Sequence, residues 1–347
     1  MRALQVRPGR GGGADLVSVD EPSPDEGSVL VEALALGVCG TDREIVRDEY
    51  GALPPGDEAL VLGHESLGRV LAAPAGCELA AGDLVAGVVR HPDPVPCSSC
   101  GAGEPDMCKN GRYTERGIKG RHGFGRERYR LEPAFAIKVP PALGHLGVLI
   151  EPASVLAKAW EHIERIGRRA HWAPRRALVT GAGPVGLLAA LMARQRGLDV
   201  HVVDLARDGP KPQLVRDLGA TYHVVDVAKA CTTADVIVEC TGAPALVLEA
   251  MRCNAGGGIV CLAGLSGSKT LDVDVGALNQ RLVLHNDVIF GTVNANRRHY
   301  RDAAEALLAA DRAWLERLIT RRVPLARWAD ALEAHEHDVK VVIDFAA

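Results

Sequence analysis

The chain has 347 residues, of which 47% are hydrophobic and 24% are charged, and its formal net charge is -4 at pH 7. This composition is ordinary for a globular protein of two domains, and the small negative charge argues against nucleic-acid binding. No apolar run reaches membrane-spanning length and the first residues lack a signal-peptide pattern, so we expect a cytoplasmic protein without a membrane role. Nine scattered cysteines fit reduced thiols or metal ligands better than a disulfide framework.

Short apolar stretches separated by Gly, Pro and Asp make up the first part of the chain. They predict strands at 29–36, 60–62, 67–72 and 84–89. Such spacing indicates an irregular and largely antiparallel β domain.

Strands and helices alternate from about residue 151 onward. Helices are predicted at 153–166, 211–218 and 243–252, and strands at 176–180, 199–203, 222–225, 234–238, 258–262 and 288–291. This alternation predicts an α/β domain with a doubly wound parallel sheet of the Rossmann type. Helices at 300–310 and 314–319 and a closing strand at 340–345 follow, and that strand most economically returns to the first domain. We therefore expect a discontinuous catalytic domain of residues 1–153 and 292–347 around a dinucleotide-binding domain of residues 154–291.

A first chemical motif combines Cys39 with the pair His64 and Glu65. A thiolate, an imidazole and a carboxylate suit Zn²⁺, and three protein ligands leave the open fourth position of a catalytic zinc site. Each motif alone would more often be a buried thiol or a hydrogen-bonded histidine.

A glycine motif lies between the strand predicted at 176–180 and a following apolar helix. In this context Gly-x-Gly-x-x-Gly binds a dinucleotide, because its glycines permit a tight turn, close approach of a pyrophosphate and close packing of the helix. Asp204 ends the next strand and can accept hydrogen bonds from the adenosine ribose. The expected cofactor-binding residues are Gly181, Gly183, Pro184, Val185, Gly186, Asp204, Arg207, Thr241 and Asn294.

Together these motifs resemble the medium-chain, zinc-dependent alcohol dehydrogenase superfamily over essentially the whole chain. The narrower likeness is to the glucose 1-dehydrogenases, and it is carried by residues 39–44, 62–65, 103–108, 113–118, 149–152 and 291–294. The resemblance implies a GroES-like catalytic domain, zinc and a nicotinamide cofactor, and oxidation of a sugar or polyol hydroxyl. For an aldose the product would be a lactone.

The resemblance also implies roles for individual residues. The zinc-site residues would be Cys39, His64, Glu65 and Glu151, although not all of them need ligate at once. Thr41 would hydrogen-bond the reacting oxygen and begin a proton relay, and Glu115 and Asn294 would bind sugar hydroxyls. Read alone, Glu151 before a proline is also typical of an ordinary helix start.

A second cysteine group departs from the pattern of the superfamily. Its structural zinc binds four cysteines, and Cys97, Cys100 and Cys108 match the last three, whereas Pro94 occupies the first position. Three thiolates hold Zn²⁺ well only with a fourth ligand, for which Asp93 and His91 are nearest. The alternative is a lobe that has lost its metal.

The choice of cofactor depends on the residues after the second strand of the dinucleotide domain. Some similar dehydrogenases have an arginine pair there for the 2′-phosphate of NADP, whereas this chain has Asp204 and only then Arg207. A carboxylate repels a phosphate, so we expect NAD in preference to NADP, which Arg207 and Lys211 leave as the alternative.

Three functional hypotheses follow. The first is a zinc-dependent sugar or polyol dehydrogenase with glucose as the leading substrate, the second a biosynthetic amino-sugar or cyclitol dehydrogenase, and the third a non-catalytic nucleotide-binding or redox-sensing protein. Analogy with similar enzymes further suggests a homodimer or homotetramer joined through residues 276–290.

Overall fold

The computed structural model describes residues 1–9, 12–224, 227–230, 233–267 and 270–346, and the chain forms two compact units. Unit 1 comprises Met1–Ser154, Asn294–Ala309 and Ile319–Ala347, and unit 2 comprises Val155–Val293 and Ala310–Leu318. The segment Ala310–Leu318 thus differs from our expectation, which placed it in the catalytic domain. Its assignment to unit 2 has a physical reason, because Trp314 Nε1 donates a hydrogen bond to Leu214 O (2.9 Å).

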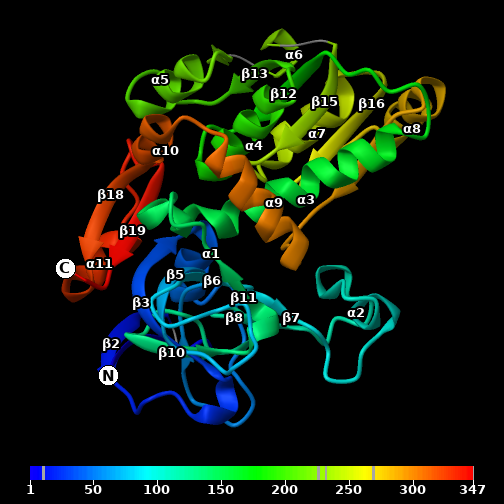
Figure 1. Cartoon of the computed structure of the whole chain (residues 1–347). Coiled ribbons are helices and arrows are strands. Elements are labelled where there is room, and N and C mark those ends of the chain that lie inside the picture. The colour runs from blue at the N-terminus through cyan, green and yellow to red at the C-terminus, as the bar shows by residue number, and fades with distance from the viewer. Residues whose placement is uncertain (10–11, 225–226, 231–232, 268–269, 347) are drawn as a thin grey trace. The chain divides into compact units, whose positions relative to one another are not determined.

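Unit 2 contains a parallel sheet with the strand order β14-β13-β12-β15-β16-β17. Its strands are β12 (Arg176–Thr180), β13 (Asp199–Val203), β14 (Thr221–His223), β15 (Ala234–Glu239), β16 (Asn254–Leu262) and β17 (Val288–Gly291). The chain starts at the centre of the sheet and winds outward in both directions, which is the order of a doubly wound dinucleotide-binding fold. The predicted Rossmann-type fold class is confirmed for this unit, whose strands lie side by side in Figure 1.

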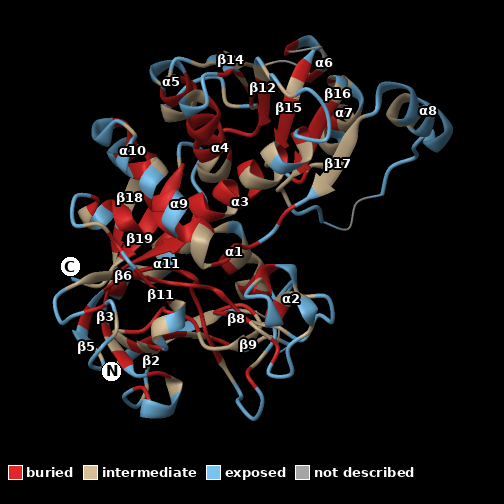
Figure 2. Cartoon of the chain, turned by 45° about the vertical axis from the view of Figure 1, so that its right-hand side comes forward, coloured by how far each residue is buried: buried red, intermediate tan, exposed pale blue. Residues whose placement is uncertain are grey.

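Unit 2 also contains helices, most of which connect these strands. They are α4 (Pro184–Gln195), α5 (Pro210–Asp217), α6 (Val227–Ala230), α7 (Pro244–Cys253), α8 (Val275–His285) and α10 (Arg312–Leu318), and α3 (Ile150–Gly167) enters from unit 1. The central strands β12 and β15 are almost continuously buried, as apolar runs of parallel sheets usually are, whereas α8 has no buried residue (Figure 2). None of the described helices is both long and apolar enough to cross a lipid bilayer.

Unit 1 is mostly β structure. Its largest sheet has the order β11-β6-β5-β3-β19-β18 with β10 also paired to β3, and two smaller sheets have the orders β2-β1-β4 and β7-β8-β9. The strands are β1 (Arg2–Val6), β2 (Ala14–Ser18), β3 (Val29–Val38), β4 (Leu60–Val61), β5 (Glu65–Ala72), β6 (Leu84–Gly87), β7 (Arg90–His91), β8 (Thr114–Arg116), β9 (Gly120–Arg121), β10 (Arg128–Leu131), β11 (Ala136–Lys138), β18 (Ile319–Pro324) and β19 (Lys340–Asp344). Because β19 pairs antiparallel with β3, the end of the chain returns to the first domain.

Unit 1 also contains helices. They are α1 (Gly40–Val46), α2 (Ser98–Gly101), α9 (Arg297–Leu308) and α11 (Trp328–Leu332), with 3-10 turns η1 (Pro24–Glu26), η2 (Pro105–Met107), η3 (Pro133–Phe135), η4 (Gly144–Leu149) and η5 (Leu325–Arg327). The apolar core of the unit gathers around β3, where Val29 and Val31 are fully buried. The carboxyl end of this central strand leads directly into the candidate active site.

Candidate active site

Cys39 lies between β3 and α1, at the N-cap of the helix. Its Sγ accepts a hydrogen bond from Thr41 N (3.3 Å), and its own backbone N–H donates to Asp42 Oδ2 (2.9 Å). This reciprocal capping arrangement satisfies amide groups that the helix itself leaves free. The start of α1 therefore fixes the thiol and places Thr41 beside it.

His64 and Glu65 follow a sharp turn between β4 and β5. Gly63 has φ +92°, and a Cβ there would lie 2.5 Å from Leu36 Cδ2, so both conformation and space require glycine. His64 and Glu65 are only 5% and 2% exposed, and the ligand atoms of Cys39, His64 and Glu65 all lie within 4.8 Å of one another. One thiol, one imidazole and one carboxylate at this spacing fit Zn²⁺ with an open coordination position.

Asp42 is a site residue to which sequence reasoning gave no role. Its Oδ1 lies 3.3 Å from His64 Nδ1, and both side chains are buried. Burial alone would lower the pKa of His64, but the nearby Asp42 and Cys39 outweigh it and raise that pKa well above 6.5. A carboxylate on one ring nitrogen orients the imidazole and directs the other nitrogen toward a metal. The signal in the sequence was the acidic residue three positions after Cys39.

Glu151 lies in the first turn of α3 and is 7% exposed. Burial, opposed by His64 and reinforced by Glu65, raises the pKa of Glu151 to about 7. Its carboxylate therefore interacts electrostatically with the metal-ligand group, but it is not one of the atoms gathered within 4.8 Å. Of the four expected zinc-site residues, the structure brings three into one compact group.

Glu115 and Asn294, the expected sugar-binding residues, contact each other inside unit 1. Asn294 Nδ2 donates to Glu115 Oε1 (2.7 Å), and Arg90 donates to the same oxygen from Nη2 (2.8 Å) and Nε (3.1 Å). Arg90 also lies over the ring of Tyr113, 3.8 Å from its centre. All three donors converge on Oε1, so Arg90, which sequence reasoning missed, neutralises and orients the carboxylate of Glu115.

The glycine turn of unit 2 has the geometry that a dinucleotide requires. Gly181 has φ +89°, and a Cβ on Gly186 would lie 1.9 Å from Gly181 O, so neither position tolerates a side chain. Gly183 has open space where its Cβ would be, and α4 begins directly after it at Pro184. Such a cradle leaves room for a pyrophosphate at the helix N-terminus. Thr241 is close by, since its Cγ2 would lie 2.9 Å from a Cβ on Gly181.

Asp204 follows β13 beside this turn. Its carboxylate accepts hydrogen bonds from Ala182 N (2.6 Å) and Ala206 N (3.0 Å), so it ties the glycine turn to the end of β13. Val185 is half-buried in the first turn of α4, and Arg207 is exposed. The negative charge of Asp204 is therefore held at the turn, while Arg207 projects into solvent.

A buried carboxylate that sequence reasoning missed organises the neighbouring strand ends. Glu239 is fully buried and accepts hydrogen bonds from Thr180 Oγ1 (3.1 Å) and from Thr241 N (2.8 Å). Its position at the end of β15 was visible in the sequence, but its burial was not. Glu239 thereby fixes Thr241 next to the glycine turn.

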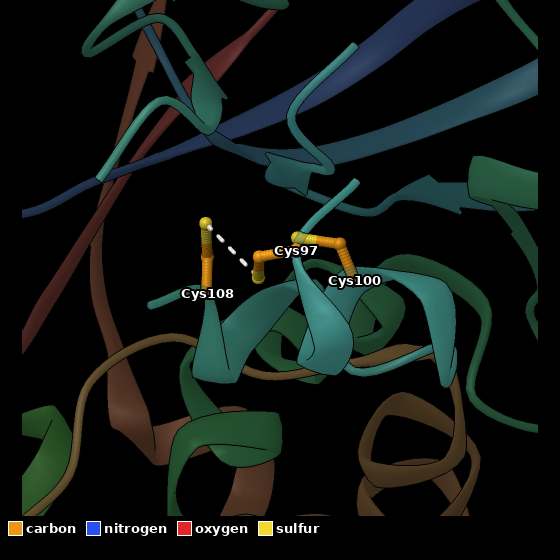
Figure 3. Close-up of side chains that lie close together, drawn as sticks. All are labelled: Cys97, Cys100 and Cys108. Carbon is orange, nitrogen blue, oxygen red and sulfur yellow. Dashed lines mark hydrogen bonds between the residues drawn. The ribbon is translucent and has the colours of Figure 1, made fainter. Parts of the chain in front are cut away.

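The second cysteine group lies near α2 (Figure 3). The thiols of Cys97, Cys100 and Cys108 lie within 4.8 Å of one another, and Cys97 Sγ is 4.0 Å from Cys108 Sγ. The backbone N–H groups of Cys100 and, next, of Lys109 (3.4 Å) hold the pKa of Cys97 down at about 6. Three thiolates arranged in this way fit a soft cation such as Zn²⁺.

Neither expected fourth ligand joins these thiols among the described residues. Asp93 accepts hydrogen bonds from Val95 N (2.9 Å) and Arg112 Nε (3.1 Å). His91 stacks on Phe135 with 3.7 Å between the ring centres. Neither Asp93 nor His91 is therefore among the ligand atoms gathered at this site.

Family models cover most of the chain. Residues 25–141 match the alcohol dehydrogenase GroES-like domain, and residues 144–345 match the glucose dehydrogenase C-terminus. Among curated proteins, the glucose 1-dehydrogenase of Methanocella arvoryzae is 40% identical over the full length of both chains. That of Thermoproteus tenax is 38% identical over 99% of each chain.

A solved structure is similar over its whole length. The glucose dehydrogenase of Haloferax mediterranei, in complex with NADP, Zn and gluconolactone, is 31% identical with a TM-score of 0.92, and the match covers 100% of both chains.

The fold and site define a medium-chain, zinc-dependent dehydrogenase that acts on a CH–OH group with a nicotinamide cofactor. Within this class the chain belongs to the glucose dehydrogenase family. The predicted resemblance and the GroES-like and Rossmann-type fold class are thereby confirmed.

Proposed function

We propose that this protein oxidises an aldose, with glucose as its leading substrate, at the anomeric carbon to the lactone. The observation that carries the proposal is that unit 1 holds both a compact group of zinc ligands and the buried, ion-paired Glu115. A simple alkyl alcohol has no further hydroxyl group that could donate a hydrogen bond to that carboxylate, whereas a sugar has such groups. The relatives named glucose 1-dehydrogenase support the same substrate.

The proposed reaction assigns each residue a task. Cys39, His64 and Glu65 would hold the zinc, with Glu151 as a buried carboxylate available for exchange. When bound, Zn²⁺ supplies Lewis acidity that lowers the pKa of the substrate hydroxyl. Thr41, beside Cys39, would accept the hydroxyl proton and pass its own proton toward solvent, and a bound nicotinamide would accept the hydride from C1.

Two further residues orient the sugar. Glu115 accepts hydrogen bonds from sugar hydroxyls, and Asn294 keeps that carboxylate in place. Asn294 is 8% exposed and has φ +60°, an uncommon backbone conformation that functional positions often retain. We also propose that Asn294 contacts the cofactor, together with the glycine turn, Thr241 and Arg207.

For the cofactor we propose NAD in preference to NADP. The carboxylate of Asp204 is held at the glycine turn by two backbone amides, so its charge would face the adenosine ribose and repel a 2′-phosphate. The Haloferax relative binds NADP, which makes the comparison of the two cofactors an informative experiment.

For the second cysteine group we propose a zinc ion held by Cys97, Cys100 and Cys108 with solvent as the fourth ligand. Support comes from the gathered thiols and from backbone N–H donors such as Lys109 N, which stabilise thiolates. The zinc content of the purified protein tests this assignment.

We further propose that the protein is a homodimer or homotetramer joined through β17 and α8. β17 is an edge strand of the parallel sheet, and Val275, Val283 and Leu284 of α8 are each more than 60% exposed. An open edge beside apolar side chains suits pairing with a second copy. Light scattering of the native protein and of Val283→Glu tests this interface, and a monomeric native protein would contradict it.

The eight described cysteines are all free, which fits a reducing compartment such as the cytoplasm.

A panel of aldoses, polyols, amino-sugars and cyclitols, assayed with NAD and NADP, tests the proposed function. We expect the highest kcat/KM with glucose and NAD. Turnover of cyclitols or amino-sugars alone would favour the biosynthetic alternative. Absence of bound zinc together with absence of turnover would favour a non-catalytic nucleotide-binding or redox-sensing protein.

A further inference from the structure

A buried lysine lies against the candidate zinc site, on the last strand of the chain. Lys340 begins β19 and is 1% exposed, and its Nζ forms an ion pair with Oε2 of Glu65, which is 2% exposed. The same Nζ donates a hydrogen bond to Val38 O (3.1 Å). A buried ammonium is costly without a partner, so this pair requires an explanation in terms of structure or function.

The strand register explains how the two side chains meet. β3 lies between β5 and β19, and Gly37 of β3 is the register partner of Glu65 on one side and of Val342 on the other. Lys340 precedes Val342 by two positions, so Lys340 and Glu65 share one face of the sheet. A Cβ on Gly37 would lie 2.0 Å from Glu65 Oε2 and 2.9 Å from Lys340 Cε. Glycine at this position therefore gives Glu65 the space to reach Lys340 across β3.

Lys340 and a metal ion would compete for the same carboxylate. Glu65 contributes one of the three ligand atoms gathered within 4.8 Å, yet its Oε2 is already paired with a cation. The contact does not have the geometry of a hydrogen bond, because Glu65 Oε2 has no hydrogen-bond partner among the described residues, whereas Nζ donates one bond to Val38 O. An ion pair of this kind retains the carboxylate at the site, weakens it as a ligand and still permits exchange.

We propose that Lys340 is a positioning residue that retains Oε2 of Glu65, so that this carboxylate remains a weak third ligand of the zinc and does not also occupy the open fourth position. The inference rests on the zinc site of the proposed function. It adds a reason why a coordination position remains open to the substrate in a site that contains three carboxyl groups, those of Asp42, Glu65 and Glu151.

The test measures metal binding directly, without any sugar. In Lys340→Met the freed carboxylate binds the metal more strongly, so we expect the dissociation constant for Zn²⁺, measured by competition with a chromogenic chelator, to fall by about 10–100-fold. The visible absorption spectrum of the Co²⁺-substituted protein should change as Glu65 binds more strongly and fills the open position, and kcat/KM for glucose should fall by about 10–100-fold. Lys340→Arg keeps the charge and should restore the native values in part.

A double-mutant cycle with Glu65→Gln separates this role from a merely structural one. If Lys340 acts through Glu65, Lys340→Met should change zinc affinity by less than about twofold in the Glu65→Gln background. The double variant also leaves no buried charge without its partner, so it should fold even where Lys340→Met alone does not. Lys138→Met removes an exposed lysine that pairs with Asp83 (2.7 Å) in the same unit and serves as the matched control.

Three results would overturn the proposal. They are unchanged zinc affinity and cobalt spectrum in folded Lys340→Met, an equal effect of Lys340→Met in both backgrounds, and failure of the double variant to fold. Failure of the proposed function gives a different result. If the protein does not oxidise glucose but zinc binding still shows the coupling between Lys340 and Glu65, the role of Lys340 stands and only the proposed substrate is wrong.

Discussion

Replacement of Glu115 by glutamine tests the sugar-binding role of the buried network around Arg90. Glu115 Oε1 accepts three hydrogen bonds of 2.7–3.1 Å from Arg90 and Asn294. The Arg90 and Glu115 side chains are 6% and 4% exposed, so solvent screens the pair little. An uncompensated charge left by breaking a buried pair costs about 3–5 kcal/mol, and we expect the free energy of unfolding to fall by about 3 kcal/mol because an amide oxygen still accepts some of these bonds.

The kinetic effect follows from the bonds to the substrate. A hydrogen bond to a charged group contributes about 1.5–3 kcal/mol, which corresponds to a loss of about 10–150-fold in kcat/KM for glucose. We would measure kcat/KM for glucose and for its 2-deoxy and 3-deoxy analogues. The native enzyme should discriminate strongly against at least one analogue, and Glu115→Gln should lose that discrimination.

A matched control is available on the surface of the same unit. Glu127 pairs with Arg2 at 2.9 Å, but the two side chains are 28% and 48% exposed. Glu127→Gln should therefore change neither stability nor sugar discrimination measurably. If Glu115→Gln lowered kcat/KM equally for glucose and for both deoxy analogues, Glu115 would not contact those hydroxyls and the reasoning would be wrong.

Four further predictions follow from the geometry. Asp42→Asn weakens the orientation of His64 and should lower zinc affinity about 10–100-fold, measured by chelator competition; native affinity would exclude this role for Asp42. Asp204→Ser removes the charge proposed to repel the 2′-phosphate and should shift the NADP to NAD ratio of kcat/KM upward by at least about tenfold, whereas an unchanged ratio would mean that another residue selects the cofactor. Cys100→Ser should reduce bound zinc from about two ions to about one per chain by metal analysis while glucose oxidation continues, and a native protein with one zinc would contradict the second site. Burial, aided by neighbouring arginines, lowers the pKa of His91 from 6.5 to about 2, so below pH 6.5 the unfolded chain binds a proton that the folded chain excludes. The contribution of neutral His91 to the free energy of unfolding is therefore complete above about pH 6.5 and should fall by about 1.4 kcal/mol per pH unit below it. Urea unfolding at two pH values should show a weaker acid dependence in His91→Phe.

Much of unit 2 was predictable from local sequence patterns. The strands expected at 176–180, 199–203 and 288–291 have those bounds in β12, β13 and β17. Strands inside a parallel sheet are buried on both faces, so β12 reads as a short apolar run before a glycine and β13 as one before an aspartate, whereas the edge strand β17 has no buried residue. Assignment of Ala310–Leu318 to unit 2 was not predictable, because it depends on the packing of Trp314 against α5 rather than on chain order.

The site residues were predictable only where several of them lie close together in the sequence. Cys39 and the pair His64 and Glu65 lie in compact motifs that suggested zinc, and the structure brings their ligand atoms together. Arg90 and Lys340 gave no signal, since a lone basic residue in a strand is usually exposed. Their roles depend on pairings between distant strands, such as that of Lys340 with Val38, 302 residues earlier. Only tertiary structure brings such residues to one place.

The pairing of β19 with β3 also bears on the order of events during synthesis. β3 leaves the ribosome early, but Lys340 of the strand that pairs with it emerges only 302 residues after Val38. Domains generally fold as units as they are made, so unit 2, nearly continuous in sequence, can fold while unit 1 still lacks its final strand. A ribosome-bound or C-terminally truncated chain would thus present Glu65 to the metal without its lysine. The pairing of β19 with β3 is then also the step that gives the zinc site its final charge.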